Sequence, residues 1–173
     1  MEDLIDMHER LSHLFALEEY TMEYLDKSWV WLNDPEIKKL TLTPDFTRQQ
    51  QLDFYENVKA RTDYWIRGVS CDAVPVGVAG LKNISYENCE AEYWGFIGEK
   101  KYHGKGGGTA MLRMVFDEAR RMGITRIYLY VWKENRVAIA LYSRSGFHCD
   151  GEYGEKLKYS MVLASSSTRE SSH

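Results

Sequence analysis

Apolar positions in this chain follow two spacings, one typical of helices and one typical of strands. Spacings of three and four residues predict helices over 22–32, 36–40, 48–61, 107–122 and 135–145. Alternating or continuous apolar runs predict strands over 12–18, 64–70, 76–84, 90–98, 126–132, 147–153 and 156–163. Strands and helices therefore mix along the whole chain, which indicates an α/β protein.

Polar and glycine residues mark several of these boundaries. Thr21 and Thr47 are candidate N-caps, and Gly123 and Gly146 end two helices. The short break after 76–84 predicts a hairpin with 90–98. In 126–132, aliphatic residues alternate with aromatic ones, which predicts a central strand covered on both faces.

Length and composition indicate one compact domain. The 173 residues are 44% hydrophobic and 28% charged, so we expect a single domain over 1–163 and a disordered polar tail over 164–173. The net charge of −4 argues against nucleic acid as a partner. The acidic N-terminus predicts no signal peptide, and no apolar run is long enough for a membrane span. Cys71, Cys89 and Cys149 have no metal-ligand spacing, so we expect a cytoplasmic protein with free thiols.

The stretch with the clearest chemistry lies between the apolar run 93–97 and the helix that begins near 107. It reads Lys101-Tyr102-His103-Gly104-Lys105-Gly106-Gly107-Gly108-Thr109. Glycines allow backbone N–H groups to approach a ligand closely, and a helix N-terminus adds a partial positive charge. A strand, a glycine turn and a helix start together predict a site for a pyrophosphate.

Three nucleotide-binding loops are candidates. The ATP-type phosphate loop requires Gly-Lys-Ser/Thr, but Gly106 follows Gly104-Lys105. The dinucleotide fingerprint requires a third glycine where Thr109 lies. The third candidate is a coenzyme A loop of the acetyltransferase kind. Its pattern is a cationic or amide residue, any two residues, Gly, any one residue and Gly. Lys101, Gly104 and Gly106 fit this pattern.

A second motif about thirty residues later separates these candidates. Residues 135–147 read Asn-x-x-Ala-x-x-Leu-Tyr-x-x-x-Gly-Phe. With both motifs in this order and spacing, the chain resembles the GNAT family of N-acetyltransferases, most closely over 75–150. The resemblance implies a mixed, mostly antiparallel sheet flanked by helices, with the fourth and fifth strands (90–98 and 126–132) splayed apart to admit acetyl-CoA.

The resemblance also implies the residues that hold acetyl-CoA, the acetyl donor. They are Phe96, Ile97, Lys101, Tyr102, His103, Gly104, Lys105, Gly106, Gly107, Gly108, Thr109, Asn135 and Tyr142. Lys101 stands where Arg or Gln is usual and meets a phosphate without bidentate geometry. Asn135 has two roles open to it, as a ligand of the pantetheine arm and as a helix N-cap. Direct transfer requires no metal.

Acetyl transfer needs an acid for the departing sulfur and a base for the amine. By resemblance, the Tyr142 hydroxyl points at the sulfur; the alternative is a tyrosine packed on the sheet. Glu92 in the triplet Ala91-Glu92-Tyr93 is the candidate base, and the alternative is a solvated carboxylate. Glu134 and a water chain remain open as other bases.

The same resemblance implies that the acetyl acceptor binds among the first helices and the loop at 40–47. Trp31, Asn33 and Asp34 are the candidate substrate-binding residues, although Asp34 also suits a turn before Pro35. We expect an N-acetyltransferase for a small primary amine, either an amino-sugar nucleotide or a polyamine-like compound. The alternatives are a protein N-terminal or lysine acetyltransferase and a coenzyme A-binding sensor without catalysis. A homodimer is left open.

Overall fold

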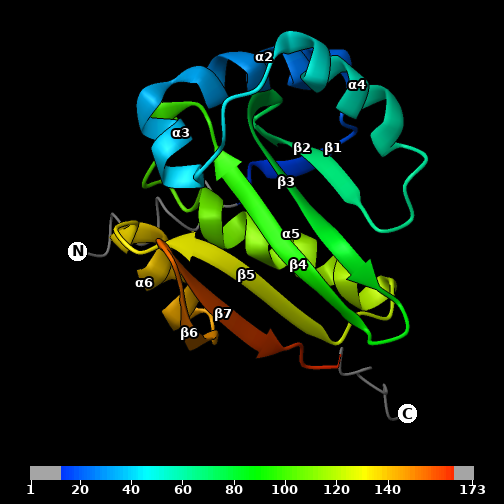
Figure 1. Ribbon diagram of the computed structural model, residues 1–173, viewed down its shortest axis with the longest axis vertical. Coiled ribbons are helices and arrows are strands. Elements are labelled where there is room, and N and C mark those ends of the chain that lie inside the picture. Colours follow the sequence, from blue (N-terminus) through cyan, green and yellow to red (C-terminus); the bar gives the residue numbers. More distant parts are fainter. Residues whose placement is uncertain (1–12, 166–173) are drawn as a thin grey trace.

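A computed structural model describes residues 13–165 of the chain (Figure 1). In chain order the elements are β1 (Phe15–Glu18), α2 (Met22–Asn33), α3 (Pro35–Thr41), α4 (Arg48–Val58), β2 (Trp65–Cys71), β3 (Val74–Ser85), β4 (Glu90–Ile97), the 3₁₀ turn η1 (Lys100–Tyr102), α5 (Gly107–Arg121), β5 (Arg126–Trp132), α6 (Arg136–Arg144), β6 (His148–Tyr153) and β7 (Lys156–Val162). Every predicted helix and strand is present. The 3₁₀ turn was not predicted.

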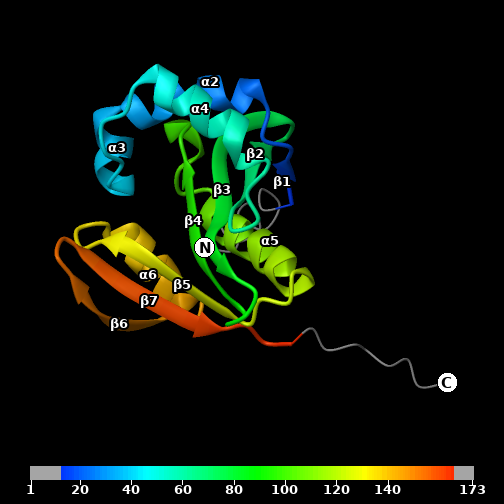
Figure 2. The same ribbon diagram turned by 45° about the vertical axis from the view of Figure 1, so that its right-hand side comes forward.

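The seven strands form one sheet in the order β1-β2-β3-β4-β5-β7-β6. Neighbours are antiparallel except β4 and β5, which are parallel. That pair is joined at only three positions, the last of them Glu92 opposite Tyr128. Beyond Glu92 the two strands separate, and Figure 2 shows β4 and β5 diverging. The predicted α/β fold with splayed fourth and fifth strands is confirmed.

Helices cover the two faces of this sheet separately. The layer of α2, α3 and α4 lies on one side, whereas α5 and α6 lie on the other (Figures 1 and 2). Successive strand residues point to opposite faces, so β4 contributes to both layers. Tyr93 packs in the core beneath α5, and Trp94 and Phe96 pack beneath α2 and α4.

The caps agree with the sequence in part. Thr47 forms a complete capping box with Gln50 at the start of α4. Gly123 follows α5 with φ of +78°, a conformation that glycine adopts without strain. Thr21 occupies the N-cap of α2, but its side chain makes no capping hydrogen bond.

The prediction that both faces of β5 are covered was wrong. Ile127, Leu129 and Val131 are buried, but Tyr130 on the other face is 38% exposed. Of the helices over β4, α3 reaches β5 at Trp132, where Lys39 Nζ lies 4.9 Å from the ring centre, and Tyr130 stays exposed. The aromatic face of β5 therefore borders the opening between the strands.

The end of the predicted domain lies within the described chain. The Arg120 guanidinium donates to the Ala164 carbonyl oxygen at 2.9 Å, so this first residue of the expected tail contacts α5. Residues 166–173 of the predicted tail lie outside the described residues.

Candidate active site

The glycine loop connects the end of β4 to the start of α5. Gly104 and Gly106 have φ of +71° and +82°, and Gly106 is the N-cap of α5. A Cβ atom at Gly104 would meet no heavy atom within 4 Å. The loop is thus open around Gly104 and leads into the N-terminus of a 15-residue helix, and helix N-termini attract anions.

Basic side chains surround this loop. The ammonium groups of Lys101 and Lys105 lie 5.4 and 5.7 Å from the centre of the Tyr102 ring. His103 Nε2 is 2.7 Å from the Ile97 carbonyl oxygen, so this side chain closes the turn. Thr109 is exposed in the first turn of α5. The loop therefore combines a helix dipole with two nearby ammonium groups.

Two of the predicted loop glycines allow close packing. A Cβ at Gly107 would lie 3.0 Å from the Phe15 ring, and Ile97 is also in contact there. A Cβ at Gly108 would lie 2.7 Å from Leu141 Cδ2, which brings the start of α5 against α6. The glycine run thus draws the helix start close to both β4 and α6.

Tyr142 lies on the α5 and α6 side of the sheet. Its ring packs edge-on against Tyr93 and Phe147, with centroid distances of 6.3 and 5.6 Å. Burial raises the pKa of Tyr142 to about 12. Its hydroxyl makes no hydrogen bond with any described residue, and its role as the acid stays a prediction.

Asn135 caps α6, as one of its two predicted roles requires. Its side-chain oxygen accepts from the Ala138 N–H at 3.2 Å. Its amide nitrogen lies 3.5 Å from the Leu40 carbonyl oxygen, which links α6 to the end of α3. Contact with a pantetheine arm stays a prediction.

Glu92 lies on the opposite face, at the point where β4 and β5 separate. The residue is 8% exposed, so it is not the solvated carboxylate of the alternative interpretation. Asn83 Nδ2 donates to Glu92 Oε2 at 2.8 Å, and Lys82 Nζ is 3.4 Å from Oε1. Glu134, the other candidate base, is exposed between β5 and α6.

Sequence analysis missed Lys82 and Asn83 as neighbours of Glu92. Asn83 adopts φ of +49° where the β3–β4 register shifts, which turns its amide toward Glu92. Asparagine tolerates this conformation, so an Asn within a strand pattern was the available signal. Burial and then the Glu92 charge raise the pKa of Tyr128.

The three predicted substrate-binding residues lie around the end of α2. Trp31 is 5% exposed, and its indole N–H donates to Glu99 Oε1 at 3.0 Å. The Asn33 amide donates to the Trp29 carbonyl oxygen. Asp34 caps α3 and pairs with Lys100 at 2.9 Å, and the hydrogen bond from Lys100 lowers the pKa of Asp34. Substrate binding by these residues stays a prediction.

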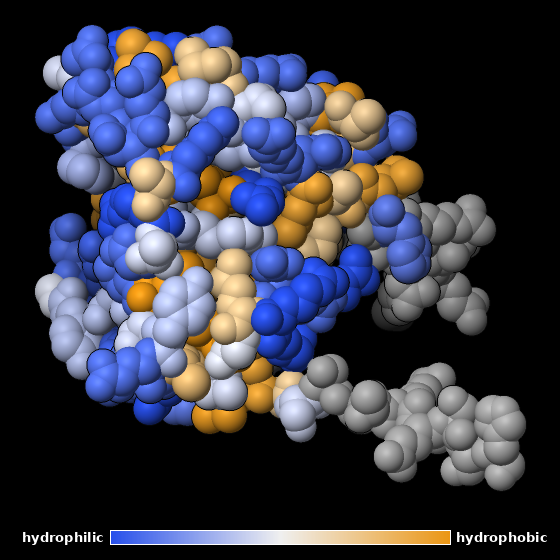
Figure 3. All heavy atoms as spheres, turned by 90° about the vertical axis from the view of Figure 1, so that its right-hand side faces the viewer, coloured by the Kyte–Doolittle hydropathy of each residue, from blue (hydrophilic) through white to orange (hydrophobic). Residues whose placement is uncertain are grey.

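Two cavities lie near α2. One of about 610 Å³ is lined by all three of these residues together with Gly98, Glu99, Lys100 and Lys101. The other, of about 270 Å³, lies beneath α2 and α4 and is lined by Trp94 and Phe96 of β4. Figure 3 shows hydrophobic atoms in the hollow between the upper helices and the lower strands.

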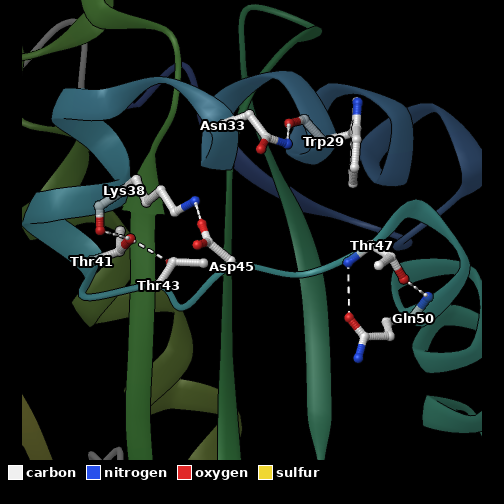
Figure 4. Close-up of polar contacts among 8 residues, drawn as sticks. All are labelled: Trp29, Asn33, Lys38, Thr41, Thr43, Asp45, Thr47 and Gln50. Carbon is white, nitrogen blue, oxygen red and sulfur yellow. Dashed lines mark hydrogen bonds and ion pairs between the residues drawn. The ribbon is translucent and has the colours of Figure 1, made fainter.

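The segment between α3 and α4 borders the smaller cavity and is fixed by local contacts (Figure 4). Lys38 pairs with Asp45, and the hydroxyls of Thr41 and Thr43 are 2.6 Å apart. Leu42 ends α3 in the left-handed conformation. These contacts hold the loop that was predicted to lie near the acceptor.

All three cysteines are free. Cys71 is 2% exposed, and burial raises its pKa. The thiols of Cys89 and Cys149 contact only backbone carbonyl oxygens among the described hydrogen bonds. A thiol without a neighbouring base is a poor nucleophile.

We therefore expect no acetylated cysteine when the protein meets acetyl-CoA without an amine. Intact-mass spectrometry should show the unmodified mass, and a Cys89→Ser, Cys149→Ser double variant should keep its transfer rate. A stable acetyl adduct on any of the three thiols would contradict direct transfer.

Within 13–165, no cluster of three or more potential metal-ligating side chains occurs. Over the same residues, no helix is both long and apolar enough to cross a membrane.

Comparison with known proteins agrees with this geometry. The model of the acetyltransferase (GNAT) family matches residues 16–147. The chain belongs to the GNAT family. A solved GNAT-fold structure, spermidine N-acetyltransferase from Vibrio cholerae in complex with CoA and spermine, superposes with a TM-score of 0.77 at 18% identity and covers 87% of this chain and 96% of its own.

Two curated relatives are similar in sequence. Spermidine N(1)-acetyltransferase of Escherichia coli is 33% identical over 49% of this chain and 45% of its own length. A probable spermine N(1)-acetyltransferase of Bacillus subtilis subsp. natto is 32% identical over 63% of this chain and 82% of its own. The chain spans less than half the length of the first curated relatives that it matches.

Proposed function

We propose that this GNAT protein transfers an acetyl group from acetyl-CoA directly to the primary amine of a small molecule. The observation that carries the proposal is the opening between β4 and β5. The glycine loop and Tyr142 lie on one side of the sheet, and Glu92 lies on the other at the last paired position. A thioester and an amine that enter from opposite faces would meet in this opening.

The chemistry divides between the two faces. The neutral amine nitrogen attacks the thioester carbonyl carbon, and the carbon–sulfur bond then breaks. A lysine-like amine has a pKa of about 10.4, so its proton has to leave, and Glu92 receives it directly or through water. The sulfur departs with the Tyr142 proton. Because burial keeps Tyr142 neutral up to about pH 12, this proton is available at neutral pH.

The backbone of β4 supports the same assignment. From Tyr93 to Ile97 the strand has no β5 partner, so the polar groups along that edge are free to bind an extended thioester arm. A backbone N–H there also suits the oxyanion that forms during transfer. These groups are fixed by the pairing of β4 with β3 on its other edge.

The acceptor is proposed to be an amino-sugar nucleotide or a polyamine-like compound. A cavity of about 270 Å³ beneath α2 and α4 has room for part of a small molecule, which supports an acceptor of this size. The three free thiols suit a reducing compartment, which supports a cytoplasmic location.

A thiol-release assay with acetyl-CoA tests the proposal over amino sugars, polyamines, aminoglycosides and peptides. We expect release that depends on one class of small amine. Release with peptides alone would favour a protein acetyltransferase. Acetyl-CoA binding without release for any amine would favour a sensor.

The glycine loop gives a second test. Gly104→Ala should weaken acetyl-CoA binding roughly tenfold to a hundredfold, because its methyl group enters the space assigned to the pyrophosphate and removes hydrogen bonds to a charged group. Calorimetry measures the Kd.

Gly123→Ala is the matched control at the other end of α5. Both glycines have φ near +75° and open space around a Cβ, so both substitutions cost the same backbone strain. The Kd of Gly123→Ala should equal that of the wild type. Equal affinities for all three proteins would place the pyrophosphate elsewhere.

A further inference from the structure

Three aromatic residues of β5 lie opposite a serine and two lysines of β7, on the face of the sheet that holds Glu92. In strand register the pairs are Tyr128 with Ser160, Tyr130 with Lys158 and Trp132 with Lys156. Tyr128 also lies opposite Glu92, and paired residues on neighbouring strands point to the same side of a sheet. The six residues of β5 and β7 form one surface, the β5–β7 face, which extends from the proposed base along the opening between β4 and β5.

The β5–β7 face is open to solvent and rich in aromatic rings. Tyr130 is 38% exposed, and its ring lies edge-on to Tyr128 at 6.1 Å and to Tyr153 of β6 at 5.8 Å. Tyr153 is itself 54% exposed. A contiguous exposed patch of apolar rings commonly marks a binding site, and flat rings suit the body of a small molecule.

Two ammonium groups lie over this surface. Lys158 Nζ is 4.9 Å from the centre of the Tyr128 ring. Lys39 Nζ, which comes from α3, is 4.9 Å from the centre of the Trp132 ring. Neither ammonium forms an ion pair with a carboxylate of residues 13–165. An aromatic ring attracts the positive charge but leaves the N–H donors of an ammonium available, so both groups can bind an anion.

The acidic groups on this side of the sheet are already paired or lie at its far end. Glu92 pairs with Lys82, and the Asp150 carboxylate is 3.1 Å from His148 Nε2 on β6. Glu90 lies at the closed end of the opening, where β4 and β5 are still paired. Positive charge therefore predominates on the β5–β7 face beyond Glu92.

Charge decides which acceptors this surface can hold. The ammonium groups of a polyamine would lie among lysines, and like charges at close range weaken binding. A phosphate or carboxylate would instead accept charge-assisted hydrogen bonds from two ammonium groups. Trp132 lies four residues beyond Tyr128, about 13 Å along β5, so one small molecule can extend from Glu92 to both lysines.

We propose that the acetyl acceptor is an amine that also carries an anionic group. Its amine lies at Glu92, and its phosphate or carboxylate binds Lys39 and Lys158 over the β5–β7 face. The inference rests on the proposed function and selects within it, because an amino-sugar nucleotide is anionic and a polyamine is not. Two kinds of molecule share this chemistry: a phosphate-bearing amine and a carboxylate-bearing amine.

A set of six-carbon amines that differ only at the far end tests the charge in the thiol-release assay. They are aminohexyl phosphate, aminohexanoate, hexylamine and diaminohexane. The better anionic amine should exceed hexylamine at least about 10-fold in kcat/KM, the effect of one hydrogen bond to a charged group, and diaminohexane should be the poorest. The order of the two anionic amines distinguishes a phosphate from a carboxylate. Hexylamine or diaminohexane as the best acceptor would overturn the inference and leave the proposed function intact.

A double variant, Lys39→Gln with Lys158→Gln, should abolish the preference for the anionic amine over hexylamine. Lys59→Gln is the matched control, because the Lys59 ammonium also lies over an aromatic ring, 5.3 Å from the centre of Tyr55, but at the end of α4. It should keep the preference. The Kd for acetyl-CoA should be the same in all three proteins. The inference is wrong if the double variant keeps the preference, or if it weakens acetyl-CoA binding instead.

A binding measurement separates the inference from the proposed function. If no amine gives thiol release, saturation-transfer NMR with aminohexyl phosphate and aminohexanoate still reports on the β5–β7 face. Binding of either anion that weakens in the double variant and not in Lys59→Gln would support the anion site alone. Binding that is equal in both variants, or absent, would overturn it.

Discussion

Tyr142→Phe is expected to lower kcat by roughly 10²- to 10⁴-fold, the usual contribution of a positioned general acid. The ring contacts with Tyr93 and Phe147 remain, and the lost hydroxyl has no protein partner among the described residues. The melting temperature and the Kd for acetyl-CoA should therefore match the wild type. Steady-state thiol release gives kcat, and calorimetry gives the Kd.

The pH dependence of this variant follows from the raised pKa of Tyr142. A phenol with a pKa of about 12 stays protonated below that pH. Removal of the Tyr142 hydroxyl should therefore lower kcat at every pH up to about 11. The position of any alkaline limb in the pH–rate profile should not change. An alkaline limb near pH 10 that disappears in the variant would contradict the raised pKa.

Tyr93→Phe is the control for Tyr142. Tyr93 is its edge-on neighbour in the same core, and burial also raises the pKa of Tyr93. Loss of this second hydroxyl should leave kcat near the wild-type value. If Tyr93→Phe lowers kcat and Tyr142→Phe does not, the acid is Tyr93.

Glu92→Gln should also lower kcat by roughly 10²- to 10⁴-fold and should abolish the acidic limb of the pH–rate profile. Protonation of Glu92 at low pH removes the base, so the wild-type rate falls as pH falls, and a neutral glutamine cannot titrate. The amide oxygen of glutamine can still accept from Asn83, which preserves the local geometry. A pH series of kcat/KM measures both effects.

Glu90→Gln is the matched control on the same strand. Glu90 lies two residues before Glu92 and is half-buried, so the variant makes the same charge change away from the opening. It should keep both the rate and the acidic limb. If Glu92→Gln keeps them as well, the base is Glu134 or a water chain.

Local sequence signals predicted the elements of this protein and the order in which they occur. The range 126–132 matches β5 at both ends because its alternation is strong. Thr47 and Gly123 marked helix ends through interactions within a few residues of the chain. The glycine loop was also predictable, since a left-handed turn before a helix depends on the residues in that turn.

Contacts between distant segments were not predictable in this way. Trp31 and Glu99 are 68 positions apart, and their hydrogen bond depends on how α2 packs over the end of β4. The exposure of the aromatic face of β5 also depends on how distant segments of the chain are arranged. Its side-chain pattern is that of a covered strand, but the splay from β4 leaves Tyr130 exposed.

The sequence by itself determined the family resemblance, the strand and helix order and the anion-binding loop, because each depends on neighbouring residues. Only the tertiary structure decided that Tyr142 and Glu92 lie on opposite faces of the sheet, that Lys82 and Asn83 hold Glu92, and that a cavity forms beneath α2 and α4. The physical reason is that side chains from different strands and helices meet only once the sheet has formed and the helical layers have packed on its two faces.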